Sequence, residues 1–438
     1  MTFTIDLSKA NTREELHDLL QEELPLPEYY GRNLDALYDV LTGVCEPMEI
    51  RLLNVSGAKD LPGGYMESFL ELCRDVREDN PLVRIHLDNE EETVRESFHG
   101  EGADPFKGKG VTADMMKEIR ITDIEGFRIG QTEDSMAGTG LTVIISEEGC
   151  AAGVDVRGGG PASRECELLR PFSAAKVIHA LVLGGGSTFG LDASGGVLKY
   201  LEEKQIGYDM GVTHIPQVCQ SDIFDLTVGD VMKRPDGKMG YEACVNSEKG
   251  NYRDGNYGAG CGATVGKWLG MEHCMKSGIG SAAVCLGDIK LGAIVAVNSI
   301  GDIFDPDTGK TIAGMLSEDK KSFRSTEQLM YETAEEGNSG FTGNTTIGAI
   351  LTNAAFDKIQ LSKIASMTHN GYARCIRPVH LSLDGDTIYA LSSGKVSANE
   401  DIIGTLAARV MSRAIVNAVK SAESAYGFPA FRDLPGLE

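Results

Sequence analysis

Two glycine-rich segments contain residue types that could bind a phosphate group. The segment GAGCGATVGKW ends in Gly-Lys, as a loop of the form G-x-x-x-x-G-K-[ST] does. However, Cys261 stands at the first glycine and Trp268 replaces the Ser or Thr that would hold magnesium. The segment GGGSTFG follows no strand with G-x-G-x-x-G spacing and is typical of a structural turn. We therefore exclude nucleotide binding. Lys267 lies among small and apolar residues, which argues against a solvated surface lysine.

A threonine hydroxyl is the second candidate for chemistry. In GFTGNTTIGAILTNA, Asn344 and Thr345 precede a run of apolar and small residues. A hydroxyl is activated as a nucleophile by an adjacent base, and a threonine within a chain has no base of its own. Threonine is also frequent in strands for packing reasons alone. NTT fits the N-glycosylation pattern, which we interpret as accidental because no secretory signal precedes it. These residues alone leave the role of Thr345 open.

Two carboxylates, Asp384 and Asp386, flank a glycine in HLSLDGDTIYA. Asp-Gly is a strong turn signal between strands, so a hairpin is one explanation of this segment. The histidines nearest to it in sequence, His369 and His380, flank the C-terminal strands, and we interpret them as structural. None of the eight histidines is accompanied by the G-x-S-x-G context of a Ser-His-Asp hydrolase.

The elements that would position these residues fall into two groups. Residues 1–88 alternate strand and helix patterns, which predicts a small α/β domain with a short parallel sheet. Residues 89–117 mix an acidic run with Gly, Pro and Lys, and we interpret them as a linker. Residues 118–438 form a second domain with longer buried strands and a helix over 399–424. Within it, residues 174–203 predict two helical stretches around a Gly-rich turn.

Composition narrows the class of protein. The 438 residues carry a net charge of -24, which argues against binding to nucleic acid or to an anionic membrane. The first 100 residues contain 9 basic against 22 acidic side chains, so an acidic surface there could attract a basic protein or simply keep the chain soluble. No apolar run of 18 residues and no signal peptide is evident, so we expect a cytoplasmic location. The ten cysteines form no C-x-x-C pair and suggest no metal site.

The run LPLPEYYGRNLDALYDVLTG resembles the barstar family of ribonuclease inhibitors, and the resemblance covers about residues 1–88. Asp35 and Asp39 stand four apart and so share one helical face. In that family the segment plugs a ribonuclease active site, where carboxylates replace the phosphates of the substrate. The resemblance implies either a basic ribonuclease-like partner or a generic acidic docking module. The positions that match this partner-binding face are Tyr29, Asn33, Asp35, Asp39 and Asp75.

The second domain resembles the L-aminopeptidase/D-amidase/D-esterase family, which includes β-peptidyl aminopeptidases and the nylon-oligomer hydrolase. RGGGPASRECELLRP and HALVLGGGSTFGLDASGGVLKYLEE carry this resemblance. It implies a four-layer α/β/β/α sandwich, assembly as a homo-oligomer, no metal or organic cofactor, and self-cleavage between Asn344 and Thr345. The amine freed by cleavage would have a pKa of roughly 7.7–8.0 and could accept the threonine proton near neutral pH.

The same resemblance assigns roles to residues around the nucleophile. Lys267 would face Thr345, and the side-chain amide of Asn298 would donate to the oxyanion. Asp384 and Asp386 match a pair of acidic positions that would orient the threonine hydroxyl and amine. In SDIFDL, Phe224 replaces a tyrosine that helps to bind the oxyanion in relatives, and we expect Asp222 to pair with the ammonium group of a substrate.

The sequence therefore predicts a self-processed hydrolase of peptide or amide bonds, an aminopeptidase that releases the N-terminal residue of short peptides. The alternative is an interaction or immunity module in which the barstar-like domain binds a ribonuclease and the second domain is catalytically inert.

Overall fold

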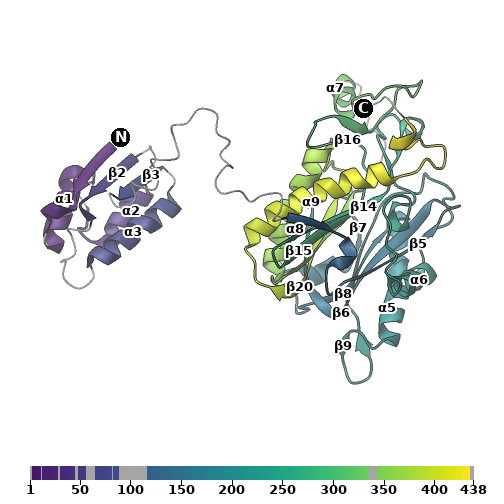
Figure 1. The fold of residues 1–438 in the computed structure, drawn as a ribbon, viewed down its shortest axis with the longest axis horizontal. Coiled ribbons are helices and arrows are strands. Elements are labelled where there is room, and N and C mark those ends of the chain that lie inside the picture. The colour runs from purple at the N-terminus through teal and green to yellow at the C-terminus, as the bar shows by residue number, and fades with distance from the viewer. Residues whose placement is uncertain are drawn as a thin grey trace. The chain divides into compact units, whose positions relative to one another are not determined.

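The computed structural model divides into two compact units, residues 1–110 and 111–438 (Figure 1). Of the expected linker 89–117, residues 89–115 lie outside the described residues. Its last two residues already belong to a strand, because β4 spans Met116–Ile119. The structure describes residues 2–10, 12–27, 30–44, 48–55, 65–80, 82–87, 116–334 and 343–434.

The first unit is the small α/β domain with a parallel sheet that the sequence predicts. Its strands are β1 (Thr2–Asp6), β2 (Met48–Leu53) and β3 (Val83–Leu87), and they pair in parallel in this order. Its α-helices are α1 (Arg13–Glu23), α2 (Leu34–Thr42) and α3 (Tyr65–Asp79). The side chains of Thr12 and Asn33 cap α1 and α2 by accepting hydrogen bonds from backbone N–H groups of the first turn.

The second unit contains a ten-stranded sheet in which one long strand, β6 (Thr139–Val156), links two halves. Residues 139–145 of β6 pair with the first half, and residues 151–156 pair with the second. We call the first the β8 half; it contains β5 (Arg128–Asp134), β8 (Ile178–Gly184), β11 (Val218–Asp222) and β7 (Ala162–Arg164). The second, the β20 half, contains β20 (Thr387–Val396), β18 (Ile347–Ala354), β15 (Ile289–Ala296), β14 (Ile279–Leu286) and β4.

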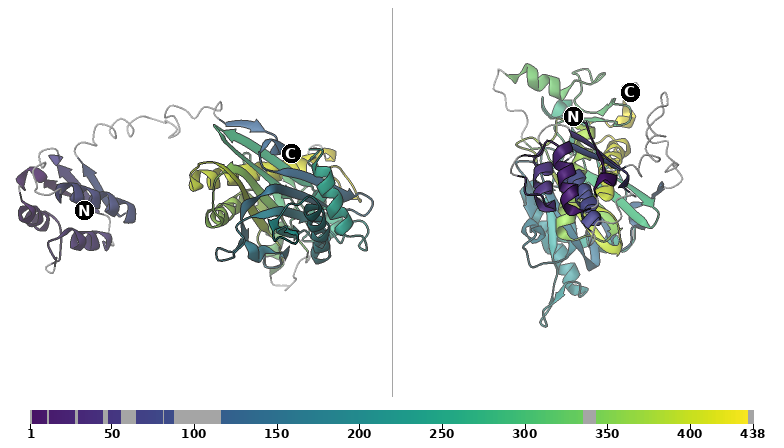
Figure 2. Two further views of the ribbon diagram at one scale, coloured as in Figure 1. Left: turned by 90° about the horizontal axis from the view of Figure 1, so that it is seen from below. Right: turned by 90° about the vertical axis from the view of Figure 1, so that its left-hand side faces the viewer.

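Three apolar cores show that these halves form the inner layers of a four-layer α/β/β/α sandwich, as expected. In β6, Val143 packs toward α5 (Ala193–Glu203) and α6 (Gly237–Ser247), whereas its neighbour Ile144 faces the β20 half. In β15, Ile294 faces the β8 half, and Val295 packs toward α8 (Lys358–Cys375) and α9 (Glu400–Ser421). Figure 2 (left) shows helices on both sides of the strands.

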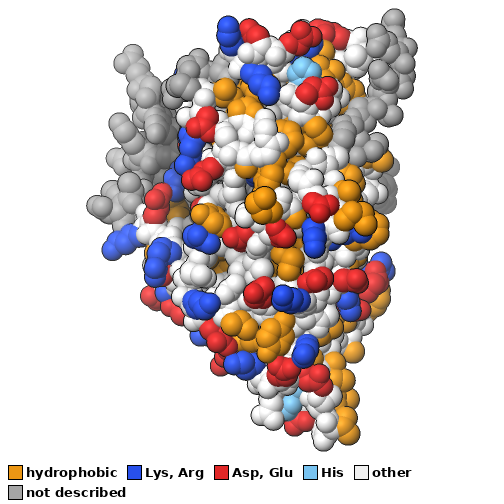
Figure 3. All heavy atoms as spheres, turned by 90° about the vertical axis from the view of Figure 1, so that its right-hand side faces the viewer, with side chains coloured by type: hydrophobic (Ala, Val, Ile, Leu, Met, Phe, Trp, Pro, Cys, Tyr) orange, Lys and Arg blue, Asp and Glu red, His pale blue; other side chains and the backbone are white. Residues whose placement is uncertain are grey.

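The helix predicted over 399–424 is α9, which begins at Glu400 and ends at Ser421. It is long and apolar enough to cross a membrane by length and composition. Most of it is buried against α8, β14 and β15, however, as expected of a core helix. The face of the second unit seen in Figure 3 carries acidic and basic side chains together with small apolar groups, so its charge is mixed.

The prediction of two helices within residues 174–203 is wrong in its first half. Residues 178–184 form β8, which lies between β6 and β11 and is buried at every position. A short run that is apolar on both faces fits a central strand as well as a buried helix, so periodicity cannot separate them. The second stretch is helical, as α5. The remaining elements are β9 (Tyr208–Asp209), β10 (His214–Ile215), β12 (Thr264–Val265), β13 (Met275–Lys276), β16 (Asp302–Phe304), β17 (Thr311–Ala313), α7 (Thr326–Glu332) and β19 (Ile376–Arg377).

Candidate active site

Thr345 lies at the entrance to β18, in the middle of the β20 half. Its backbone N–H donates to the carbonyl oxygen of Asn298 at 2.9 Å, and the preceding Asn344 forms an isolated parallel bridge with Asp384. The residue is only 5% exposed in the uncleaved chain. Three segments that are far apart in sequence, around residues 298, 344 and 384, thus meet at this threonine.

The carbonyl oxygen of Asn344 accepts two hydrogen bonds. The hydroxyl of Thr345 donates to it at 2.5 Å, and the backbone N–H of Gly385 donates at 3.1 Å. The hydroxyl oxygen therefore lies beside the carbonyl group of the Asn344–Thr345 peptide bond. The N–H of Gly385 is placed to stabilise negative charge that develops on that oxygen during an attack.

Residues 384–386 are not a hairpin turn. They lie between the segment that contains Thr345 and the glycines of the RGGGP motif, and the N–H of Gly160 donates to the carbonyl of Asp384 at 2.8 Å. A Cβ on Gly158 would stand 2.2 Å from that same carbonyl oxygen, so the close approach of the two segments requires glycine there. The glycines of RGGGP thus allow the DGD segment to reach the nucleophile.

Asp384 is buried and has one carboxylate oxygen available. Its Oδ2 accepts the N–H of Leu381 at 2.8 Å, and its Oδ1 is buried without a hydrogen-bond partner among the described residues. Burial, and then the neighbouring carboxylate of Asp386, raises the pKa of Asp384 to about 7. A carboxylate with such a pKa is suited to accept a proton near neutral pH.

The carboxylate of Asp386 accepts hydrogen bonds from backbone N–H groups rather than from the hydroxyl of Thr345. Its Oδ1 accepts the N–H of Thr346 at 2.8 Å, and its Oδ2 accepts the backbone N–H of His380 at 3.1 Å and that residue's Nδ1 at 2.9 Å. We expected both carboxylates to orient the hydroxyl of Thr345. In the uncleaved chain that hydroxyl donates to Asn344 instead, and Asp386 orients the following residue.

Lys267 and Asn298 contact each other at the site. Lys267 is fully buried, and its Nζ donates to the side-chain oxygen of Asn298 at 2.5 Å. Burial lowers the pKa of Lys267 to about 8, and the nearby acidic groups Asp384 and Asp225 oppose this shift. The sequence predicts that Lys267 faces Thr345; in the structure Lys267 contacts Asn298, whose carbonyl oxygen accepts the N–H of Thr345.

The expected oxyanion contact of Asn298 is not made in the uncleaved chain. Its Nδ2 donates to the carbonyl oxygen of Phe224 at 3.0 Å, and its Oδ1 also accepts the N–H of Thr264 at 3.1 Å. Because Oδ1 has two donors, the amide is fixed with its nitrogen toward Phe224. Phe224 therefore takes part in the site through its backbone, and a Cβ on Gly343 would collide with its ring at 2.6 Å.

Asp222 is the residue that we expected to pair with the ammonium group of a substrate. It is fully buried at the end of β11, where its Oδ1 accepts Nε2 of Gln220 at 2.8 Å and its Oδ2 has no hydrogen bond among the described residues. A Cβ on Gly190 would stand 2.8 Å from that Oδ2. Burial raises the pKa of Asp222 well above its usual value, which favours a neutral carboxyl. A neutral, enclosed group is a poor partner for an ammonium ion, so its proposed role in substrate binding lacks support.

Two buried charges near the site were missed from the sequence. Lys276 donates to the carbonyl oxygens of Gly260 and Ala263, both at 3.1 Å, and burial lowers its pKa to about 7. Asp225 accepts the hydroxyl of Thr139 and the N–H of Gly186, each at 2.7 Å. Neither residue lies in a recognisable short motif. Each is identified only by the loop groups to which it hydrogen-bonds in the structure. Among the described residues, no three His, Cys, Asp or Glu side chains come together to hold a metal ion.

Four acidic residues of the first unit line one groove of about 430 Å³ between α2 and α3. Asp35 and Asp39 of α2 and Asp75 of α3 line it, as the resemblance implies, together with Tyr38 and Glu71. Asn33 does not line this groove: its Oδ1 caps α2 by accepting the N–H of Ala36 at 2.9 Å, and its Nδ2 donates to Gly31. Tyr29 lies outside the described residues.

Both units match known protein families. Residues 120–431 match the model described as Peptidase family S58, and residues 1–94 match the model described as Barstar (barnase inhibitor). An uncharacterized aminopeptidase of Mycobacterium leprae (strain TN) is 35% identical over 344 residues, which cover 71% of this chain and 92% of that protein.

A more distant relative and a solved structure extend this result. A 6-aminohexanoate-oligomer endohydrolase of Agromyces sp. (strain KY5R) is 30% identical over 338 residues, which cover 74% of this chain and 92% of that protein. The structure of an L-aminopeptidase D-Ala-esterase/amidase from Ochrobactrum anthropi superposes with a TM-score of 0.51 at 17% identity, covering 69% of this chain and 86% of that one. That likeness concerns the fold.

Proposed function

The chain belongs to peptidase family S58 and is a hydrolase of the aminopeptidase and amidase type, and from this premise we propose that it cuts itself before Thr345. Thr345 then becomes the N-terminal residue and the nucleophile toward substrates. The substrates are short peptides or small linear amides. We further propose that the cleaved chain assembles as a homo-oligomer in the cytoplasm.

One observation carries this proposal: the arrangement around the carbonyl group of Asn344. The hydroxyl of the next residue lies 2.5 Å from its oxygen, and the N–H of Gly385 donates to the same oxygen. The backbone of Asp384 is bridged to Asn344 itself, and this buried residue keeps one carboxylate oxygen without a hydrogen-bond partner among the described residues.

The proposed self-cleavage proceeds in two steps. The hydroxyl oxygen of Thr345 attacks the carbonyl carbon of Asn344 while Asp384 accepts the hydroxyl proton. The C–N bond breaks, the amine of Thr345 takes up a proton as it leaves, and an ester joins the two residues. Water then hydrolyses the ester, which yields a carboxylate on Asn344 and a free hydroxyl and amine on Thr345.

Cleavage supplies what the intact chain lacks. The new amine has a pKa of roughly 7.7–8.0 and lies on the same residue as the hydroxyl, so it can take the hydroxyl proton when a substrate is attacked. Cleavage also frees Thr345 from the peptide bond that links it to Asn344. The buried ammonium of Lys267, which contacts Asn298, adds positive charge close to the reacting atoms.

The rate of self-cleavage is expected to rise with pH and to level off above about pH 7. Asp384 accepts a proton only in its charged form, and its raised pKa places that form above about pH 7. Below this value the rate should fall about tenfold per pH unit, in proportion to the charged fraction. Mass spectrometry of protein incubated at each pH should follow the appearance of a fragment of 94 residues, 345–438.

Asp384→Asn should slow cleavage at every pH and remove the pH dependence of the rate. Asp307 is an exposed aspartate, and the control variant Asp307→Asn should behave as the wild type. A rate that is independent of pH in the wild type would contradict the role of Asp384. A chain that stays whole at every pH would contradict self-cleavage itself and favour an inert second domain.

A second function is favoured by the groove of the first unit. Three aspartates and Glu71 line it, so it offers several negative charges to one partner. Together with the match to the Barstar model, we propose that it binds a basic protein of the ribonuclease class.

The charge of the groove gives a measurable expectation. With barnase as the probe in titration calorimetry, Asp39→Ala should weaken binding at least about tenfold, and the affinity should fall as salt rises. Glu22→Ala is the matched control, because Glu22 is an exposed acidic residue of α1 outside the groove. Equal losses for both variants, or no binding by the wild type, would contradict this function.

A further inference from the structure

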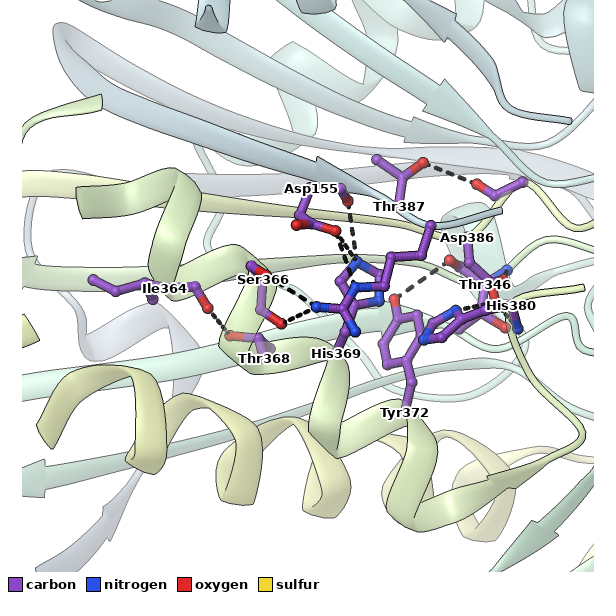
Figure 4. A network of polar contacts seen from close by, with 12 residues as sticks. Asp155, Thr346, Ile364, Ser366, Thr368, His369, Tyr372, His380, Asp386 and Thr387 are labelled. Atoms are coloured by element: carbon purple, nitrogen blue, oxygen red, sulfur yellow. Dashed lines mark hydrogen bonds and ion pairs between the residues drawn. The ribbon is translucent and has the colours of Figure 1, made fainter. Parts of the chain in front are cut away.

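We propose that His380 is a positioning residue for the nucleophile and acts through Asp386. This inference rests on the proposed function of Thr345. His380 donates to Oδ2 of Asp386 from its backbone N–H and from Nδ1, at 3.1 and 2.9 Å. A charged carboxylate only accepts hydrogen bonds, so Nδ1 carries the proton. Figure 4 shows His380 beside Asp386, with Thr346 next to them.

The contact between His380 and Asp386 is linked to Thr345 through one peptide unit. The other oxygen of Asp386 accepts the N–H of Thr346, whose nitrogen is bonded to the carbonyl carbon of Thr345. The carbonyl of Thr346 is fixed as well, by the N–H of Thr387 at 3.1 Å and the hydroxyl of Tyr372 at 3.4 Å. His380 thus helps to hold the backbone that aims the Thr345 hydroxyl at the Asn344 carbonyl, where small displacements lower the rate strongly.

The imidazole ring is itself held in place. It lies edge-on to His369, with ring centroids 4.7 Å apart, and stacks on Tyr372 at 6.0 Å. Its Nε2 is buried and has no hydrogen bond among the described residues. The polar contact that the ring makes is therefore the one to Asp386, and the remaining contacts are packing.

The backbone of His380 explains which substitutions can test this. Its φ is +62°, in the left-handed region that Asn and Asp enter more readily than other non-glycine residues. The substitution His380→Asn would place an amide N–H near the position of Nδ1. Asp has the same shape as Asn but offers a negative charge to Asp386, and Gly keeps the backbone N–H and accepts the φ angle but lacks the side-chain donor.

His380→Asn is expected to self-cleave within about threefold of the wild-type rate, because the donor to Asp386 is kept. His380→Gly and His380→Asp should be slowed at least about thirtyfold, and their turnover of a short peptide anilide should lose kcat more than it raises KM. In the background of Asp386→Ala, replacing His380 by Gly should cause no further loss, because the relay is already broken.

The outcomes separate the possible failures. If His380→Asn is as slow as His380→Asp, the side-chain donor is not what matters, and the proposal is wrong. It is equally wrong if His380→Gly cleaves normally, or if it slows the Asp386→Ala variant further. Circular dichroism and thermal melting show whether each variant is folded, and the Asn and Asp pair remains decisive if the Gly variant is not. Failure of the wild type to cleave would instead count against the proposed function.

Discussion

Replacing Thr345 by valine is expected to leave the protein as one chain of 438 residues and to abolish peptide hydrolysis. Valine keeps the shape of threonine but has no hydroxyl, so neither attack on Asn344 nor attack on a substrate can occur. The N–H bond to Asn298 is unaffected by this change. Mass spectrometry should find no fragment of 94 residues, 345–438, in this variant. Turnover of a peptide anilide should fall by at least about 10³-fold.

Thr346→Val is the matched control, because it removes a hydroxyl from the next residue. That hydroxyl is buried without a hydrogen-bond partner among the described residues, so its loss costs the fold little. The backbone N–H that Asp386 accepts is retained. If the Thr346→Val variant cleaves normally and the Thr345→Val variant stays uncleaved, Thr345 is the nucleophile. The reverse pattern, or a fragment from Thr345→Val, would show that a different residue attacks.

Local patterns in the sequence were sufficient to predict the first unit and some elements of the second. The parallel sheet of the first unit and helix α9 follow from strand and helix periodicity that burial then matches. The error at β8 has the opposite cause, because a strand covered on both faces shows no alternation. The four-layer arrangement came from family resemblance, since no local pattern shows which two half-sheets will face each other.

In the candidate site too, some features could be predicted from the sequence and others could not. Thr345, Lys267 and Asp384 could be proposed because family motifs mark them, and the fold brings them to one place. The direction of a side chain could not be predicted, because it depends on neighbours from distant segments. The amide of Asn298 turns to Phe224 because Thr264 and Lys267 occupy its oxygen.

Two residues that belong to no recognised motif, His380 and Lys276, were not predicted to act at the site. His380 was interpreted as structural, since a single histidine near a strand usually is. Its contact with Asp386 depends on how residues 380–386 fold back on themselves before β20, which no local pattern shows. Lys276 was missed because a buried lysine that binds three backbone carbonyls resembles any other lysine in the sequence.

Gly385→Ala is expected to slow self-cleavage at least about 100-fold while the protein remains folded. A Cβ at this position would lie 2.7 Å from Oγ1 of Thr345 and 2.9 Å from its Cγ2, closer than real Cβ contacts. Either the threonine side chain turns away from the Asn344 carbonyl, or residues 384–386 move and carry the N–H of Gly385 out of reach. Loss of one oxyanion donor alone costs about 10²–10³ in rate.

Gly195→Ala is the control, because a Cβ there meets nothing within 4 Å and the residue lies in helix α5, where alanine is favoured. It should cleave at the wild-type rate, and a wild-type rate for Gly385→Ala would exclude the close packing that we describe. Adding Thr345→Ser to Gly385→Ala distinguishes the two causes. Serine lacks Cγ2 and relieves the crowding, so partial recovery indicates a displaced nucleophile. No recovery indicates that the N–H donor has moved, because a smaller side chain cannot restore it.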